Sequence, residues 1–152
     1  MSLEQRLRSL ECRVQEAEDR LALLDLEAEY ARSWDAADAQ AWAALFTEHG
    51  AFEMAGVGHQ HRRSVQGSAQ LAAFCQEVSA FYQGLHFMHL PRVQLQGHTA
   101  FARVHFQWTG VFHAASHFHG QRSAQGYYDV TYRRCDDGRW RILHRLEKAM
   151  TG

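Results

Sequence analysis

Residues 99–112 read TAFARVHFQWTGVF, and the pattern of this stretch indicates the fold class. Every second residue over most of its length is apolar, at Ala100, Ala102, Val104, Phe106 and Trp108. Successive side chains of a strand point to opposite faces of a sheet. The period of two therefore predicts a long strand with one face turned toward a protein core.

Strand-like sequence continues on both sides of this stretch. Residues 97–98, Gly-His, form a predicted tight turn, and residues 113–121 form a predicted loop. Further strands are expected at residues 86–96, which Pro91 interrupts, at 127–134 and at 139–148. The second half of the chain is thus predicted to be an antiparallel sheet.

The first part of the chain predicts a long helix. Its apolar residues alternate spacings of four and three, at Leu3, Leu7, Leu10, Val14, Ala17, Leu21 and Leu24. This heptad seam indicates one helix through Asp35, and the charged residues between, Asp19 included, are expected to face solvent. The seam packs either on its own domain or on a neighbouring subunit. We assign residues 1–20 to a helical extension for oligomerisation and residues 21–152 to the domain.

Two shorter helices are expected before the sheet. Asp38 is a predicted N-cap, and its helix has a core stripe of Trp42, Leu45 and Phe46. Ser68 is predicted to cap a third helix, whose buried face is Leu71, Phe74, Cys75, Val78 and Tyr82. Residues 51–54 are expected to form a short strand and residues 56–67 a loop. Helices followed by antiparallel strands predict an α+β domain, with a concave pocket between the helices and a curved sheet.

Composition narrows the classes of function. The 152 residues suit one domain, and 16 basic against 17 acidic residues give a net charge of −1. Without a basic patch we expect no nucleic-acid partner, and without a long apolar run we expect no membrane partner. Three widely spaced cysteines predict reduced thiols and a cytoplasmic location. A small molecule is the expected partner.

Six short motifs lie along the chain: LDL at 24–26, YAR at 30–32, DAAD at 35–38, VQLQGHTA at 93–100, GYY at 126–128 and GRWRI at 138–142. Together they resemble the SnoaL-like proteins of the nuclear transport factor 2-like superfamily, and the resemblance covers about residues 20–147. It implies a cone of curved, mixed or antiparallel sheet wrapped by about three helices, the cystatin-like α+β barrel. Because the superfamily includes enzymes and non-catalytic binders, the resemblance indicates a fold more strongly than a reaction.

One subgroup is similar at more positions: scytalone dehydratase, bile acid 7α-dehydratase and hexachlorocyclohexane dehydrochlorinase. These proteins have an aspartate late in the first helix and a histidine opening the first long strand, which implies catalytic roles for Asp35 and His86 here. The resemblance also implies a catalytic Tyr30 and a pocket arginine, Arg145. A strand position that holds a second acid–base residue in some of these dehydratases is Phe106 in this chain.

The chemistry of these residues agrees with such roles but also allows structural ones. A neutral imidazole accepts a proton near pH 7, and a carboxylate bound to its other nitrogen stabilises the imidazolium that forms. Asp35 and His86 could instead be a helix cap and a buried histidine. Tyr30 is either a hydrogen-bond donor to substrate or a core aromatic residue. Arg145 either neutralises an enolate or forms an ion pair with Asp129 or Glu147.

The remaining candidate residues concern the lining of the pocket and the binding of a metal ion. Apolar substrate contacts are predicted for Trp34, Met54, Phe106, Trp108 and Tyr128. Histidine pairs two residues apart, His59 with His61 and His117 with His119, could each supply two metal ligands. Because both pairs fall in predicted loops with few carboxylates nearby, we favour no metal and no cofactor.

These observations predict a cofactor-independent lyase, dehydratase-like, or an isomerase. The substrate would be a small, largely apolar, ring-bearing molecule, and His86 oriented by Asp35 would be the general base. The alternatives are a non-catalytic small-molecule-binding or assembly protein on the same fold and, third, a metalloenzyme. The heptad seam and the quaternary states that are usual in the family favour a homodimer or homotrimer.

Overall fold

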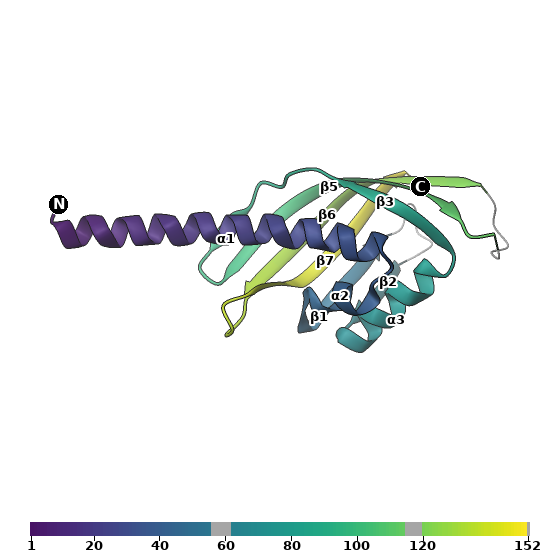
Figure 1. The fold of residues 1–152 in the computed structure, drawn as a ribbon, viewed down its shortest axis with the longest axis horizontal. Coiled ribbons are helices and arrows are strands. Elements are labelled where there is room, and N and C mark those ends of the chain that lie inside the picture. The colour runs from purple at the N-terminus through teal and green to yellow at the C-terminus, as the bar shows by residue number, and fades with distance from the viewer. Residues whose placement is uncertain (56–61, 115–119, 152) are drawn as a thin grey trace.

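A computed structural model describes residues 1–55, 62–114 and 120–151. A curved sheet of seven strands has its inner face covered by three helices (Figure 1). The predicted α+β class with helices on one face of a mixed sheet is therefore confirmed.

The helices begin and end at residues with clear physical reasons. Helix α1 (Leu3–Asp35) starts with a capping box, in which Ser2 and Gln5 exchange side-chain to backbone hydrogen bonds. Helix α2 (Ala39–Ala44) has the predicted cap, because the Asp38 side chain accepts from the Ala41 amide at 3.1 Å. Helix α3 spans Ser68–Ser79. Among the residues described, none of these helices is both long and apolar enough to cross a membrane.

The sheet joins the two halves of the chain. Its strands are β1 (Phe46–Ala55), β2 (Arg62–Gln66), β3 (Tyr82–Met88), β4 (Gln94–Gln96), β5 (Thr99–Phe112), β6 (Gln121–Arg134) and β7 (Trp140–Thr151). The order is β2-β1-β7-β6-β5-β3, and β4 pairs with β5. The β1–β7 pair is parallel, whereas the other pairs are antiparallel. Strand β1, which follows α2, therefore lies beside β7, the last strand of the chain.

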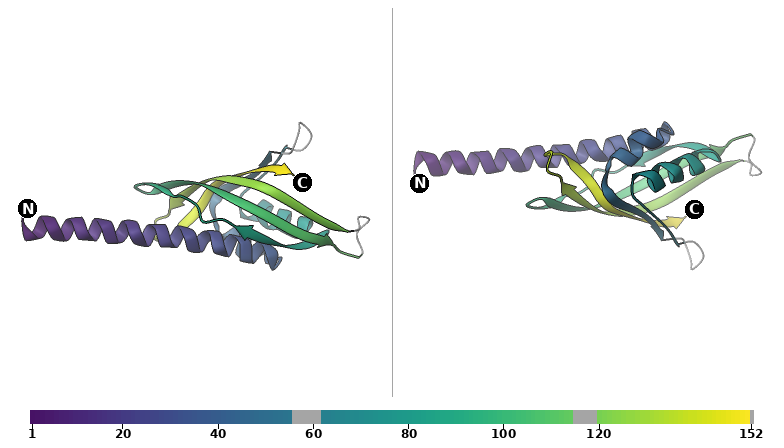
Figure 2. Two further views of the ribbon diagram at one scale, coloured as in Figure 1. Left: turned by 90° about the horizontal axis from the view of Figure 1, so that it is seen from above. Right: turned by 90° about the horizontal axis from the view of Figure 1, so that it is seen from below.

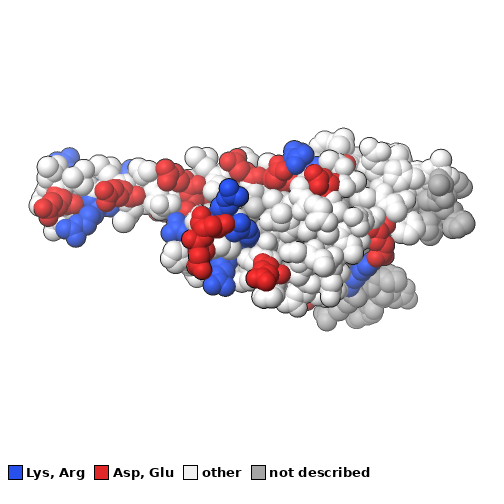
Figure 3. Space-filling model, turned by 60° about the horizontal axis from the view of Figure 1, so that its bottom comes forward, with Lys and Arg blue, Asp and Glu red and all other residues white. Residues whose placement is uncertain are grey.

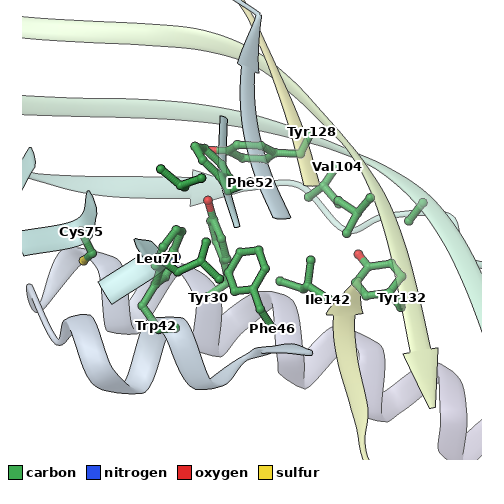
Figure 4. Close-up of a cluster of buried hydrophobic side chains, with 14 of the residues drawn as sticks. Tyr30, Trp42, Phe46, Phe52, Leu71, Cys75, Val104, Tyr128, Tyr132 and Ile142 are labelled. Carbon is green, nitrogen blue, oxygen red and sulfur yellow. The ribbon is translucent and has the colours of Figure 1, made fainter. Parts of the chain in front are cut away.

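The core lies between the inner face of the sheet and the helices (Figure 4). The alternation predicted for β5 is confirmed, since its five apolar positions are all buried. Trp42 of α2 contacts several aromatic rings, and its side chain is fully buried. Burial of such aromatic side chains supplies most of the free energy that holds the helices on the sheet.

Helix α1 has two parts with different surroundings. Residues 1–18 are exposed and extend beyond the sheet, whereas the following turns lie across its inner face (Figures 1 and 2). The expectation that Asp19 faces solvent is wrong. Its carboxylate is buried, accepts from Trp140 Nε1 at 2.9 Å and forms an ion pair with Arg134 at 3.1 Å. The seam residues of the projecting part do not pack on their own domain.

Several predicted boundaries are also wrong. Phe46 begins β1 instead of continuing the second helix, because the Ile142 amide donates to the Leu45 carbonyl and draws the chain into the sheet. Residues 62–66, expected in a loop, form β2 against β1. The N-cap of α3 is Gly67 at φ 82°, where glycine is favoured, and not Ser68.

Two further elements start elsewhere than predicted. Tyr82 belongs to β3 and not to the third helix, since it pairs with Phe112. Strand β6 starts at Gln121 and extends the predicted strand toward the loop.

Candidate active site

A cavity of about 300 Å³ lies between the helices and the inner face of the sheet. Seven residues predicted from the sequence line it: Tyr30, Trp34, Met54, His86, Phe106, Trp108 and Tyr128. Its other lining residues are Phe52, Phe74, Val78, Tyr82, Arg122, Ala124, Glu147 and Ala149. The wall is mostly aromatic, with a few polar groups that can orient a ligand.

The alternation of β3 directs His86 into this cavity. Tyr82, Gly84, His86 and Met88 are partly buried, whereas the residues between them are exposed. His86 is the fifth residue of β3 and pairs with Trp108 of β5, so it lies within the strand and not at its start. Its side chain is only 6% exposed.

Asp35, the last residue of α1, holds His86 with both carboxylate oxygens. Oδ1 lies 2.7 Å from His86 Nδ1, and Oδ2 accepts from the His86 backbone amide at 2.8 Å. An ionised carboxylate only accepts hydrogen bonds, so the neutral imidazole carries its proton on Nδ1. In that form the lone pair is on Nε2, the nitrogen that a general base needs.

Two tyrosine rings lie close to His86, and the Tyr30 ring is 6.3 Å from the imidazole between centroids. The Tyr128 hydroxyl is 3.4 Å from Nε2, and the Tyr128 ring stacks on Phe106 with centroids 4.4 Å apart. The Tyr30 ring meets Tyr128 edge-on at 5.7 Å, and the two side chains point toward one another (Figure 4). Burial raises the pKa of both tyrosines, so each remains a protonated hydrogen-bond donor at neutral pH.

Arg145 lies behind these tyrosines and does not line the cavity. Its side chain is fully buried, and its guanidinium forms three hydrogen bonds of 2.8–3.0 Å with Glu27 of α1. Neither Asp129 nor Glu147, the ion-pair partners expected for it, bonds to it; Asp129 pairs with Arg103 and Lys148. The guanidinium also stacks on the rings of Tyr30 and Tyr128, at 3.6 and 3.9 Å from their centroids.

The cluster around Glu27 explains the charge of Arg145. Burial opposes that charge most, but the Glu27 carboxylate, together with Tyr30 and Tyr128, outweighs burial and raises the pKa of Arg145. Glu27 also accepts from the Tyr132 hydroxyl at 2.6 Å. Arg145 thus supports the two tyrosine rings from behind, while its charge is neutralised by α1.

Sequence reasoning missed two polar residues of the cavity. Glu147 lies two positions after Arg145 on β7, and burial raises the pKa of its carboxyl to about 7, although Arg145 partly opposes that rise. Arg122 is the only Lys or Arg among the lining residues that the structure describes. The inward alternation of β7 could have indicated Glu147, whereas β6 was predicted to begin after Arg122.

The described chain contains no group of three or more His, Cys, Asp or Glu side chains arranged to bind a metal ion. The predicted pairs His59–His61 and His117–His119 fall outside the described residues.

Three helices closing a curved sheet around an aromatic pocket define an α+β protein of the nuclear transport factor 2-like class. Residues 15–146 match the SnoaL-like domain, and the chain therefore belongs to the SnoaL-like family. No curated protein matches the chain.

Solved structures agree with this assignment. An NTF2-like protein with a cystatin-like fold from Novosphingobium aromaticivorans is 25% identical, with a TM-score of 0.77 and coverage of 96% of this chain and 91% of that one. A protein of unknown function from Mycobacterium tuberculosis is 25% identical, with a TM-score of 0.75 and coverage of 88% and 73%. A hexachlorocyclohexane dehydrochlorinase from Novosphingobium barchaimii is 13% identical, with a TM-score of 0.76 and coverage of 91% and 90%. The last likeness shows the fold alone.

Proposed function

We propose that this protein is a cofactor-independent lyase of the dehydratase type, or an isomerase that shares its first step. The observation that supports this most is the Asp35–His86 pair, with Nδ1 bound at 2.7 Å and Nε2 at the wall of an aromatic cavity. A binding protein needs the cavity but not an imidazole whose tautomer is set by a carboxylate that also binds the backbone amide of the same residue. One of the similar structures is by name a dehydrochlorinase of hexachlorocyclohexane, and an elimination from a ring agrees with this class of reaction.

The proposed elimination divides the proton transfers between two groups. His86 Nε2 takes a proton from a carbon next to a carbonyl, and the C–H electron pair forms the new double bond. The bond between the neighbouring carbon and its hydroxyl breaks, and the protonated Glu147 gives its proton so that the hydroxyl leaves as water. Tyr30 and Tyr128 donate hydrogen bonds to the substrate oxygen that gains charge. In an isomerisation, the proton on His86 returns to another carbon.

The cavity limits the substrate. Its volume of about 300 Å³ is at the low end of small-molecule sites, which suits a molecule of one or two rings. Aromatic walls favour a flat or unsaturated ring, and Arg122 adds a cation that favours an oxygen-bearing substituent. The substrate class is therefore a cyclic β-hydroxyketone or a ring of similar size with another leaving group.

The test uses one- and two-ring β-hydroxyketones, with hexachlorocyclohexane as a ring that loses chloride. Enone formation is followed by ultraviolet absorption, chloride by an ion electrode, and carbon-bound deuterium by NMR in D₂O. We expect turnover of at least one compound, and His86→Gln should lower kcat by about 10²–10⁴-fold. His105→Gln is the matched control, because His105 points outward from β5.

Equal turnover by the His86→Gln variant and the wild type would refute the base assignment. Binding of these rings without turnover or deuterium exchange would favour the non-catalytic alternative.

A further inference from the structure

The projecting part of α1 and the turn that follows it carry large apolar side chains that the fold leaves exposed. Leu3, Leu7, Leu10, Val14 and Leu21 are between 50% and 72% exposed. They belong to the seam with spacings of four and three, which is the repeat of helices that supercoil around one another. Five large apolar side chains on one stripe of a helix indicate a binding surface.

This seam faces away from the domain. Leu21 and Leu23 are two residues apart, or about 160° around the helix. Leu23 packs on the sheet and is fully buried, whereas Leu21 is 62% exposed. The helix therefore has one face for its own domain and an opposite face that remains free for a partner, without a rearrangement of the fold.

The charges beside the seam are sorted by sign. The positions that directly follow Leu3, Leu10, Ala17 and Leu24 are acidic: Glu4, Glu11, Glu18 and Asp25. The positions that directly precede Leu7, Val14 and Leu21 are basic: Arg6, Arg13 and Arg20. Figure 3 shows both signs along the projecting helix. Within the part of the chain that the structure describes, Arg6, Glu11, Arg13 and Glu18 make no ion pair.

We infer that the partner is a second copy of this chain, bound through a parallel, in-register, two-stranded coiled coil. In that arrangement the basic flank of one helix faces the acidic flank of the other, so Arg6 and Arg13 meet the partner's Glu11 and Glu18. In an antiparallel pair the basic flank would face the partner's basic flank and the acidic flank its acidic flank, and these like charges would oppose association. Leucine occupies three of the four seam positions equivalent to Leu3, and Val14 lies between Leu7 and Leu21 at the alternate positions. Leucine at the first set and a β-branched residue in the second agree with two strands.

Contacts with the domain limit the seam at its C-terminal end. Arg20 is already bound, since it donates to the Val93 carbonyl at 2.7 Å and pairs with Glu16. Farther along α1, Glu27 and Tyr30 are buried against the sheet. The interface therefore spans residues 3–24 and leaves the cavity of each copy open on its own domain.

The first test changes the seam in the full-length chain. Leu10→Glu with Val14→Glu should raise the dimer dissociation constant by roughly a hundredfold or more, measured by sedimentation equilibrium. The control, Ser9→Glu with Cys12→Glu, adds the same charge on the opposite, exposed side and should leave the constant unchanged. Circular dichroism and the melting temperature verify that both variants fold. A dimer with a Kd of about 100 µM or less would be populated at a chain concentration of about 100 µM. The inference would be overturned by a wild type that is monomeric at that concentration, or by a dimer that the seam change does not affect.

The second test distinguishes the orientations. Arg6→Glu with Arg13→Glu places like charges opposite each other in a parallel dimer and should weaken it by about tenfold. Adding Glu11→Arg and Glu18→Arg to the same chain should restore the association. In an antiparallel dimer the first change would have little effect, since its flanks are already of like charge. That result, or a trimeric mass, would contradict the proposed arrangement.

Discussion

At the scale of single residues, the central feature is that Asp35 uses both carboxylate oxygens on His86. One oxygen accepts from the backbone amide, and the other accepts from Nδ1. The first contact fixes the position of the strand relative to the end of α1, and the second fixes the tautomer. Nε2, the proposed base, is therefore oriented before any substrate binds, which in the proposed reaction would lower the cost of reaching the transition state.

Asp35→Asn tests the tautomer. The asparagine side chain has a single acceptor oxygen, so its NH₂ group would face Nδ1 when that oxygen binds the backbone amide. The imidazole proton would then move to Nε2 and remove the base, and we expect kcat to fall by about 10²–10⁴-fold. Steady-state kinetics measure this change, with Asp25→Asn on the exposed face of α1 as the control. An unchanged kcat would show that Asp35 does not set the tautomer.

Glu147 determines the expected behaviour at high pH. Its pKa of about 7 exceeds the ordinary value of 4.5, because burial favours the neutral carboxyl. The proposed acid is thus present below pH 7 and is lost as the pH rises through that value, so kcat should decline above about pH 7. Glu147→Gln should lower kcat and abolish this decline, whereas Glu53→Gln should keep it. A decline that survives in Glu147→Gln would assign it to another group.

At the scale of elements, two glycines shape the cavity wall. Gly84 of β3 and Gly110 of β5 are paired residues, and the Trp108 indole lies against both. A Cβ atom at either position would overlap the indole and the neighbouring backbone. The absence of side chains at these two points therefore allows Trp108 to lie flat against the sheet beside the cavity.

Gly110→Ala should displace the Trp108 indole and strain the β3–β5 pairing. We expect a loss of about 1–3 kcal/mol in the free energy of unfolding, measured by urea denaturation, and weaker binding of ring compounds. Gln107→Ala is the control, because Gln107 is exposed on the outer face of the same strand. A variant with wild-type stability would mean that the indole is free to move away from the glycines.

At the scale of the whole molecule, buried polar groups attach α1 to the sheet. Asp19 bonds to Trp140 and Arg134, and farther along the helix Glu27 bonds to Arg145 and Tyr132. These contacts supplement the apolar core and fix the helix in one position along the sheet. They also hold the tyrosines of the cavity, since Arg145 stacks on Tyr30 and Tyr128.

Removing only one member of the buried ion pair should be costly. Glu27→Ala leaves the Arg145 charge buried without its partner, and we expect the free energy of unfolding to fall by about 3–5 kcal/mol. The double variant Glu27→Met with Arg145→Met removes both charges and should recover much of this loss. Chemical denaturation measures each value. A change of less than about 1 kcal/mol for Glu27→Ala would contradict a strong coupling between helix and sheet.

The parts of the fold that followed local patterns were predictable. The alternation in β5 and the seam of α1 could be predicted from neighbouring residues alone, and the Asp38 cap could be predicted from the point where a helix begins. Strand β2 was missed because its five residues carry little apolar alternation, and its pairing with β1 stabilises it. Asp19 and Glu27 were missed as buried residues because charge predicts exposure unless a partner is known.

The candidate site divides in the same way. From the sequence, His86 was a pocket candidate through the resemblance to the SnoaL-like proteins, and Tyr128 was one through its place on a predicted strand. The contact of Asp35 with His86, 51 residues away, and that of Glu27 with Arg145, 118 residues away, became visible in the folded chain. Such pairs depend on the order of the strands, which places β3 at one end and β7 between β1 and β6, and this order is set by the packing of the whole chain. For the same reason Glu147 became a candidate acid only in the folded molecule, where burial raises its pKa.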